Sequence, residues 1–346
     1  MLSRVADALF WLSRYTERAE NNARMMDVNL QLMLDVQPLT NNQHWESIIF
    51  TLEDTKLFDK LYPGIAGDAV VDFVTFERKN PNSIYSCIAT ARENARTVRE
   101  QISVEMWEQI NRMYLFFSSG DAKRLFQNST YEFFKWILEG SQLFQGVTDA
   151  TMAHDEGWEF IRLGMFLERA DRTSRILDIK YHILLPSGEQ IGGNVDTVQW
   201  MAVLKSCSAL EPYRKHYRGQ VVPWKVVEFL VKNQTFPRSI LFCVDSLDFA
   251  LHKITGVDRG DFQYKVEAER LSGKLLADLC FVTIDEIFRT GLHQYLDKMQ
   301  GRLIVISKAI YNEFCEWLEE GETQGEEEEQ EEQAETQPKQ FQEQKS

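Results

Sequence analysis

Proline and glycine are scarce in this chain, and their scarcity limits the choice of fold. The 346 residues include 8 Pro and 18 Gly, whereas average usage would give about 17 and 24. Both residues destabilise helix interiors, and turn-rich β folds depend on them. The composition therefore predicts an all-α protein and argues against a turn-rich β fold.

Long apolar runs, dense basic runs and paired cysteines are also missing. No apolar stretch reaches the ~18–20 residues of a membrane span, and the N-terminal MLSRVADALFWL carries an acid inside its apolar run, unlike a signal peptide. A net charge of −15 without a Lys/Arg run argues against nucleic-acid binding. The five cysteines form no CxxC pair, which is typical of reduced thiols in a cytoplasmic protein. We expect neither nucleic acid nor membrane as a partner.

The motifs of common catalytic and cofactor sites are absent from the sequence. There is no GxSxG, no P-loop and no GxGxxG. None of the six histidines has a glutamate three residues before it, the spacing that di-iron bundles use. Cys87 and Cys243 lie in apolar helical segments, which favours a core role over a nucleophile. The residues therefore assign no reaction, and we predict no cofactor and no metal.

The chain contains an internal repeat. The segments YTERAENNARMMDV (15–28) and FLERADRTSRILDI (166–179) share an ERA triplet, a following acid and an arginine four residues on, at an offset of 151. A second pair of blocks, 70–88 and 226–244, follows in the same order at an offset of 156 and aligns proline, serine and cysteine. Collinear matches of this kind indicate a tandem duplication.

The duplication predicts a domain organisation. We expect a large helical bundle of two pseudo-symmetric halves, 1–150 and 151–320, packed as one unit. The tail at 321–346 has nine Glu and almost no apolar residues, so it is expected to be disordered. Helices are predicted over 2–35, 42–60, 67–77, 82–117, 121–143, 153–183, 196–216, 223–232, 237–255, 261–291 and 295–318.

Each copy of the repeated helix carries a row of charges at helical spacing. The rows are Glu17, Glu20, Arg24 and Asp27 in the first copy, and Glu168, Asp171, Arg175 and Asp178 in the second. Arg18 and Arg169 flank them. Neighbouring positions changed between the copies, Asn21 to Arg172 for example, whereas the rows kept their charges. We favour two helices crossing through Arg–carboxylate bridges, while a ligand or partner site and a metal site stay open.

The helix predicted over 82–117 carries arginines that its counterpart in the second half lacks. Arg92, Arg96, Arg99 and Ser103 are predicted to share one face. Three arginines in one stripe could bind a carboxylate or a phosphate. The interpretation that we favour pairs them with the glutamates of the repeated helices in the bundle interior.

Four segments resemble the alpha-E family, a bacterial all-helical group of unknown function. They read MLSRVADALFWLSRYTERAENNARMMDV, ARENARTVREQISVEMWEQIN, TDATMAHDEGWEFIRLGMFLERADRTSRILD and FPRSILFCV. The resemblance covers about residues 1–318 and implies an all-α fold. The family's motifs fall here on Glu17, Arg18, Arg24, Arg92, Glu93, Asn94, Arg96, Glu168, Arg169 and Arg175.

The resemblance implies partners rather than a reaction. Family members are typically encoded beside, or fused to, a circularly permuted ATP-grasp ligase, often with a transglutaminase-like and a proteasome-like peptidase. This context implies a scaffold or accessory subunit of an amide-bond (peptide) ligase system, which binds the ligase or a peptide-like substrate through charged helix faces. Two alternatives stay open: an enzyme acting on a peptide or amide with Glu17 or Glu93 as acid or base, and a tail that serves as a modification substrate.

Overall fold

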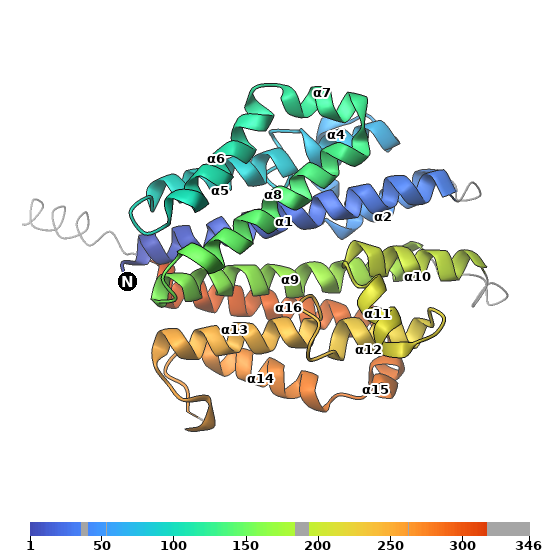
Figure 1. Ribbon diagram of the computed structural model, residues 1–346. Coiled ribbons are helices and arrows are strands. Elements are labelled where there is room, and N and C mark those ends of the chain that lie inside the picture. The colour runs from blue at the N-terminus through green and yellow to red at the C-terminus, as the bar shows by residue number, and fades with distance from the viewer. Residues whose placement is uncertain (36–40, 53, 184–193, 262, 317–346) are drawn as a thin grey trace, which may run out of the picture. The chain divides into compact units, whose positions relative to one another are not determined.

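The computed structural model describes residues 1–35, 41–52, 54–183, 194–261 and 263–316, and every regular element within them is helical (Figure 1). Residues Met1–Cys315 form one compact unit. The predicted tail at 321–346 lies outside the described residues. The elements are α1 (Ser3–Asp35), α2 (Asn41–Thr51), α3 (Thr55–Leu61), α4 (Gly67–Thr75), α5 (Ile84–Thr97), α6 (Val104–Ser118), α7 (Asp121–Asn128), α8 (Thr130–Thr151), α9 (Glu156–Ile183), α10 (Asn194–Ser206), α11 (Leu210–Tyr217), α12 (Pro223–Lys232), α13 (Ile240–Thr255), the 3-10 turn η1 (Arg259–Asp261), α14 (Glu267–Phe281), α15 (Ile284–Thr290), α16 (Leu292–Ile310) and the π-helical turn η2 (Tyr311–Cys315).

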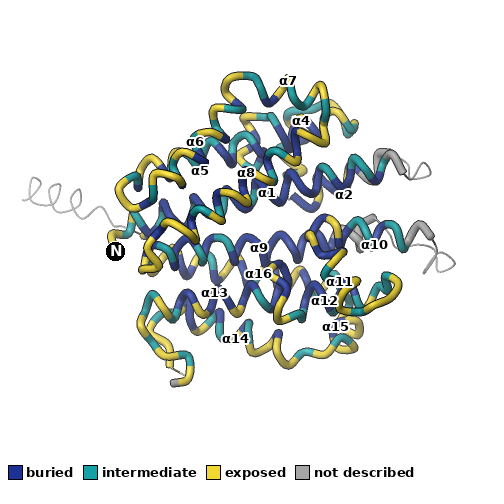
Figure 2. Tube along the Cα trace, viewed as in Figure 1, coloured by how far each residue is buried: buried dark blue, intermediate teal, exposed yellow. Residues whose placement is uncertain are grey.

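Helices α1 and α9 pack against each other at the centre of the compact unit (Figure 1). Helices α5 and α8 cover α1, and α13 and α16 cover α9. Both central helices are buried along most of their described length (Figure 2). Their charged side chains are therefore withdrawn from water and need partners inside the protein. Across the described ranges, no helix combines the length and the apolarity that crossing a membrane requires.

Small residues let the two central helices approach each other closely. Gly164 of α9 lies against the backbone of α1, because a Cβ atom added there would be 2.2 Å from the carbonyl oxygen of Phe10. Ala19 and Ala23 of α1 and Ala170 of α9 are all fully buried. The short side chains bring the two backbones near enough for charged residues of one helix to reach the other.

Several helices that the sequence predicts as continuous are divided where a hydroxyl side chain caps a new helix. The predicted helix over 82–117 is two helices, because the backbone leaves the helical conformation at Val98 (ψ 35°) and Ser103 caps α6 through the amide of Met106. Ser129 divides the predicted helix over 121–143 in the same way. Serine in the middle of a periodic segment satisfies the free amides of a helix start, so the single helices were wrong. The predicted helices over 42–60, 196–216 and 261–291 are also divided.

The predicted helix starts after the two repeated prolines are confirmed. Ser83 caps α5 and Ser239 caps α13, each by accepting a hydrogen bond from the amide three residues later. Cys87 and Cys243 follow four residues after these caps, and both are fully buried, as expected for core residues. The all-α fold is confirmed. The tandem duplication and the division at residue 150 stay predictions, and such equivalent settings are what a duplication would produce.

Candidate functional site

The central helices are joined by two reciprocal ion pairs. Arg18 of α1 donates to Glu168 of α9 through Nε at 2.7 Å and Nη2 at 3.0 Å. Nε of Arg169 on α9 lies 3.0 Å from Oε1 of Glu17 on α1. Each helix thus supplies a glutamate to the other helix and takes a glutamate from it. The helices cross through the Arg–carboxylate bridges that the charged rows led us to favour.

Glu168 is held by three arginines from two helices. Besides Arg18, Arg14 of α1 donates through Nε at 3.0 Å, and Arg172 of α9 donates through Nε at 3.0 Å. The Glu168 side chain is 0% exposed. Burial alone would raise the pKa of Glu168, but the three guanidinium groups outweigh burial and hold the pKa well below its usual value. The carboxylate is therefore ionised in the protein interior.

Glu17 and Glu20 form a second buried centre with an arginine from the other half. Arg238, just before α13, donates to Glu17 through Nη1 and to Glu20 through Nη2, both at 2.6 Å. Gln145 of α8 donates to both carboxylates at 2.9 Å. Burial alone would raise the pKa of Glu17, but Arg169 and Arg238 lower it to about 2.

The other charged residues of the two predicted rows make matching contacts at the second and third positions of each row. Their contacts differ at the fourth position. One helical turn separates the partners in two ion pairs, Arg24–Glu20 and Arg175–Asp171. Asp178 lies 2.9 Å from Nδ1 of His293 on α16. Asp27 is only partly buried, and burial raises its pKa. The fourth positions therefore have different surroundings in the two copies.

The arginines predicted to share one face of a long helix do not reach the buried glutamates. Arg96 pairs with Glu93 at 2.7 Å, and its side chain is 68% exposed. Arg92 pairs with the same Glu93 at 2.5 Å. Arg99 lies in the turn between α5 and α6, and Ser103 is the cap of α6. The predicted pairing with Glu17 and Glu168 was wrong, because α5 ends at Thr97 and its arginines pair locally.

These arginines instead form a surface patch with aromatic residues of α6. The guanidinium group of Arg92 lies 4.6 Å from the ring centre of Tyr114 and 5.5 Å from that of Trp107. The guanidinium group of Arg99 lies 5.5 Å from the Trp107 ring. Asn94 donates to the carbonyl of Thr90 within α5, a local structural contact. We call Arg92, Arg96, Arg99, Trp107 and Tyr114 the arginine–aromatic patch.

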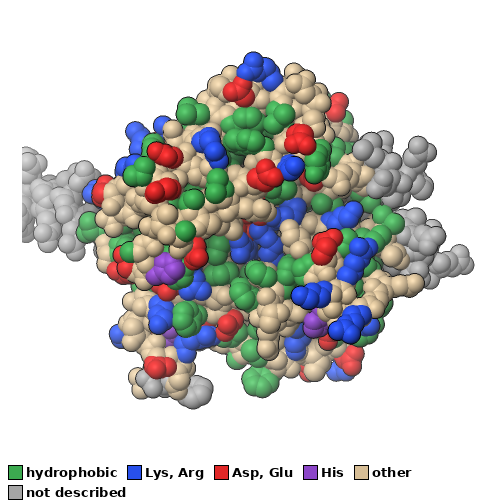
Figure 3. Space-filling view, viewed as in Figure 1, with side chains coloured by type: hydrophobic (Ala, Val, Ile, Leu, Met, Phe, Trp, Pro, Cys, Tyr) green, Lys and Arg blue, Asp and Glu red, His purple; other side chains and the backbone are tan. Residues whose placement is uncertain are grey.

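Two grooves border the buried network. The first groove, of about 410 Å³, is lined mainly from α1, α9 and α16, and we name it the arginine groove. Its lining includes Arg14, Arg18, Arg172, Arg175, Ser307 and Lys308. The second groove, of about 330 Å³, is lined from α1, α8 and α9, and we name it the tryptophan groove after Trp158. Its lining also includes Glu17, Gln145, Arg162, Met165 and Arg169. Figure 3 shows a hollow with basic side chains between α8 and α9, where the tryptophan groove lies.

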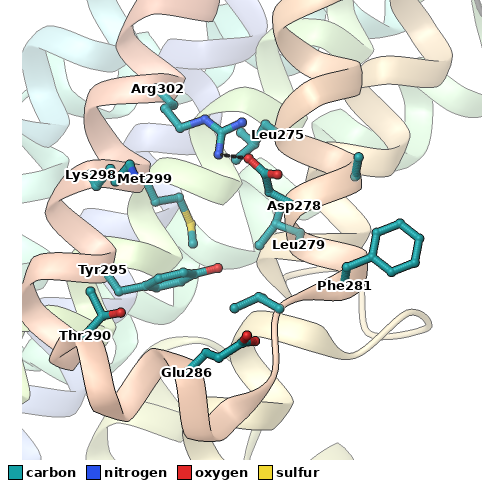
Figure 4. A pocket seen from close by; sticks show the side chains of 12 residues that line it. Leu275, Asp278, Leu279, Phe281, Glu286, Thr290, Tyr295, Lys298, Met299 and Arg302 are labelled. Carbon is teal, nitrogen blue, oxygen red and sulfur yellow. Dashed lines mark hydrogen bonds and ion pairs between the residues drawn. The ribbon is translucent and has the colours of Figure 1, made fainter.

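A further pocket, of about 520 Å³, lies between α14, α15 and α16 (Figure 4). Its lining is largely apolar and includes Met299 and Tyr295. Asp278 and Arg302 form an ion pair at 2.7 Å, and Phe281 beside it points away from the pocket and is 84% exposed. None of the residues predicted from the sequence lines this pocket.

The described residues offer little for acid–base, nucleophilic or metal chemistry. Within those ranges, no group of three or more His, Cys, Asp and Glu side chains is placed to hold a metal ion. Burial raises the pKa of the Cys87 and Cys243 thiols to about 12, so neither is a thiolate near neutral pH. Arginines lower the pKa of Glu17 and Glu168, so these two buried carboxylates are weak bases. The arrangement is therefore suited to binding anions and bracing helices.

Sequence reasoning missed several members of the network. The charged rows do not single out Arg238, Arg14 or Gln145. A signal for Arg238 was present, because the repeat aligns it with Asn82 between a proline and a capping serine. Asn82 also joins the network by accepting a hydrogen bond from Arg18 at 2.7 Å. Gln145 has no such signal, since its place depends on how α8 crosses α1.

Comparison with known proteins points to one family. The Alpha-E family, described as a predicted alpha-helical domain with a conserved ER motif, matches residues 1–315. Both central helices carry an ER pair followed by alanine, Glu17-Arg18 and Glu168-Arg169. In the structure, the glutamate of each pair binds the arginine of the other. No solved structure matches the chain.

Similar curated proteins are themselves uncharacterized. One from Mycobacterium bovis and two from Mycobacterium tuberculosis are each 23% identical to the chain over 275 residues. The match covers 73% of this chain but 30% of each relative. The chain thus spans about 30% of the length of the relatives that it matches, and most of each relative lies outside the match.

Proposed function

Because the chain belongs to the Alpha-E family, we propose that it is a non-catalytic helical accessory subunit of an ATP-grasp amide-bond ligase system. Its partner is a circularly permuted ATP-grasp ligase, the protein that the family resemblance implies. It works beside the ligase in the cytoplasm, and transglutaminase-like and proteasome-like peptidases act in the same system. It binds the ligase or a peptide-like substrate through charged surfaces.

The observation that carries the non-catalytic role is the closure of the ER glutamates by arginines. Glu17 is 1% exposed and Glu168 is 0% exposed. Glu17 is paired with two arginines of the second half, and Glu168 with arginines of both halves. With its pKa lowered to about 2, Glu17 is a poor general base, since an efficient base has a pKa near the working pH. The ER motif is therefore a brace between two helices, which argues against an enzyme that uses Glu17.

The arginine–aromatic patch supports a protein partner. Trp, Tyr and Arg are the residue types that dominate binding energy in protein interfaces. Here Trp107 and Tyr114 hold the guanidinium group of Arg92, while Arg96 is left largely exposed. The matching helix of the second half has no such arginine stripe, so the patch is specific to the first half. We propose that the ligase docks on this patch.

The length of the curated relatives also supports a role beside another protein. Their matched segment is covalently linked to a larger remainder. A domain that is linked to further sequence in its relatives commonly works together with that linked sequence. We propose that the ligase is this working partner.

Co-purification tests the docking proposal. Tagged full-length chain from its native cell should recover an ATP-grasp ligase in near-stoichiometric amount, and Arg96→Ala should lose it while the fold survives. Arg124→Ala is the matched control, because Arg124 is a 75% exposed arginine of another helix with its own i,i+3 partner. Recovery of the chain alone, or equal ligase recovery with both variants, would refute docking at this patch.

A further inference from the structure

We infer that the arginine groove is a binding site for an oxyanion, a carboxylate or phosphate group carried by a short peptide-like molecule. The groove lies beside the ER brace, apart from the arginine–aromatic patch, and is lined from α1, α9 and α16. The choice of an acidic peptide as the natural ligand rests on the proposed function, whereas the need for an oxyanion rests on the groove itself.

Guanidinium groups converge on the groove from two helices. Arg14 and Arg18 come from α1, and Arg172 comes from α9. All three side chains are about nine-tenths buried, at 12%, 12% and 10% exposed. Only one carboxylate, Glu168, is shared among them. Burial lowers the pKa of Arg14, although Glu168 acts in the opposite direction.

The tryptophan groove provides an internal comparison, because the repeat relates the two grooves. Among the described lining residues, the arginine groove has five cationic side chains and two carboxylates. The tryptophan groove has two cationic side chains and two carboxylates. Even when Glu168, which pairs with three of these cations, is included, the arginine groove has more cationic than anionic side chains, and a bound oxyanion would offset the difference.

Arg14 and Arg172 distinguish the surroundings of Glu168 from those of Glu17. The repeat aligns Arg14 with Met165 and Arg172 with Asn21. Asn21 makes the contact equivalent to that of Arg172, since each donates to the glutamate four residues earlier, at 3.1 Å and 3.0 Å. Asparagine or methionine therefore suits these positions in the other copy, where a reciprocal ER pair also forms. A ligand that needs the guanidinium groups gives a reason for the difference.

The rest of the groove indicates what carries the oxyanion. Leu167 and Leu303 provide apolar walls, and the volume of about 410 Å³ suits a short peptide segment rather than a free ion alone. The Ser307 hydroxyl accepts from Arg14 at 2.9 Å and can turn its own proton toward a ligand. Asp54, which accepts from the side-chain amide of Asn82 at 3.2 Å, also lines the groove. These features favour an acidic peptide.

Calorimetric titration of the full-length chain tests the site without any ligase. The probes are a triglutamate peptide and inorganic phosphate, each in a buffer free of carboxylates and phosphate. We expect saturable 1:1 binding of the peptide. If phosphate also binds and the peptide displaces it, both probes bind through their oxyanion groups. If phosphate binds and the peptide does not, the oxyanion site is supported and an acidic peptide is refuted as its ligand. If neither probe binds, the inference is overturned.

Variants locate the binding. Arg14→Met and Arg172→Asn copy the residues of the other half, and each should weaken binding at least tenfold, the loss expected for one charge-assisted hydrogen bond. Arg162→Met removes a cation from the tryptophan groove and should leave the affinity unchanged. Lys308→Met, at the exposed rim of the groove, should also weaken binding. This variant tests the site if a variant of a buried arginine fails to fold. Equal affinity in wild type and groove variants would overturn the assignment even if the ligase still co-purifies.

Discussion

Single residues decide whether charge can be kept inside this protein. Glu17 and Glu168 are both buried, and each has more than one arginine within ion-pair distance. Removing one partner from such a cluster leaves a buried charge without compensation, which costs more than the pair itself contributes. Because each glutamate is bound by more than one arginine, its side chain is held in one geometry. These ion pairs therefore fix the relative position of α1 and α9.

Acid should destabilise the protein through Glu17. The pKa of this carboxyl is about 2 in the fold, against 4.5 ordinarily, so the unfolded chain takes up the proton first as the pH falls. The stabilisation is complete above about pH 4.5 and is lost as the pH falls from there toward 2. The shift corresponds to about 3 kcal/mol. Urea unfolding at pH 7, 5, 4 and 3 measures it.

The control for this titration is Glu17→Gln. The variant should be less stable at pH 7 and should lose less stability between pH 5 and 3 than the wild type. Glu93→Gln, at a half-exposed surface pair, should leave the wild-type slope unchanged. Equal slopes for the wild type and Glu17→Gln would show that Glu17 does not carry a lowered pKa.

At this scale, the sequence identified which charges matter better than it identified their partners. The spacing of the repeated rows singled out Glu17, Glu168, Arg18 and Arg169, which lie at the crossing. It did not reveal Arg238, because that contact joins the turn before α13 to α1 and depends on the packing of the two halves. It also overstated Arg99, because a single buried turn at Val98 removes that residue from the helix face.

Small residues at the contact between helices decide how closely the helices pack. Gly164→Ala should destabilise the protein, because the new Cβ would lie 2.2 Å from the Phe10 carbonyl of α1 and force the central helices apart. We expect a cost of about 2 kcal/mol or more, typical of overpacking at a tight contact. Gly146→Ala in α8 is the matched control, since nothing lies within 4 Å of its added Cβ.

The control should change stability in the opposite direction. Alanine favours the helix over glycine by about 1 kcal/mol in an open helical site, so Gly146→Ala should stabilise the protein slightly. Thermal and urea unfolding of both variants measure the two effects. A stabilising Gly164→Ala would mean that α1 and α9 do not approach as closely as the structure shows.

Element boundaries show where sequence reasoning about helices fails. The periodicity of apolar residues placed α1, α9 and α12 within a few residues of their observed bounds. It joined α5 to α6 and α7 to α8, because the apolar spacing continues across both breaks. Ser103 and Ser129 end that continuity by capping new helices, and serine alone in a sequence does not distinguish a cap from a surface residue.

At the scale of the whole molecule, the reciprocal brace makes each half incomplete. Residues 1–150 contain Glu17 and Arg18 but lack Arg169 and Glu168, and residues 151–320 lack the first pair. Residues Met1–Cys315 form one compact unit. A separated half would expose the apolar and charged face of its long helix, and the buried ions would lose their partners.

We therefore expect that neither half folds cooperatively when produced alone, whereas the two halves produced together form a 1:1 complex. The cut falls between α8, which ends at Thr151, and α9, which begins at Glu156. Size-exclusion chromatography and near-ultraviolet circular dichroism distinguish a packed complex from separate collapsed chains. Weakening the brace by Arg18→Met should lower recovery of the complex more than Arg124→Met, an exposed arginine outside it. A half that unfolds cooperatively by itself would show that the halves are independent domains and that the ER pairs only fasten them together.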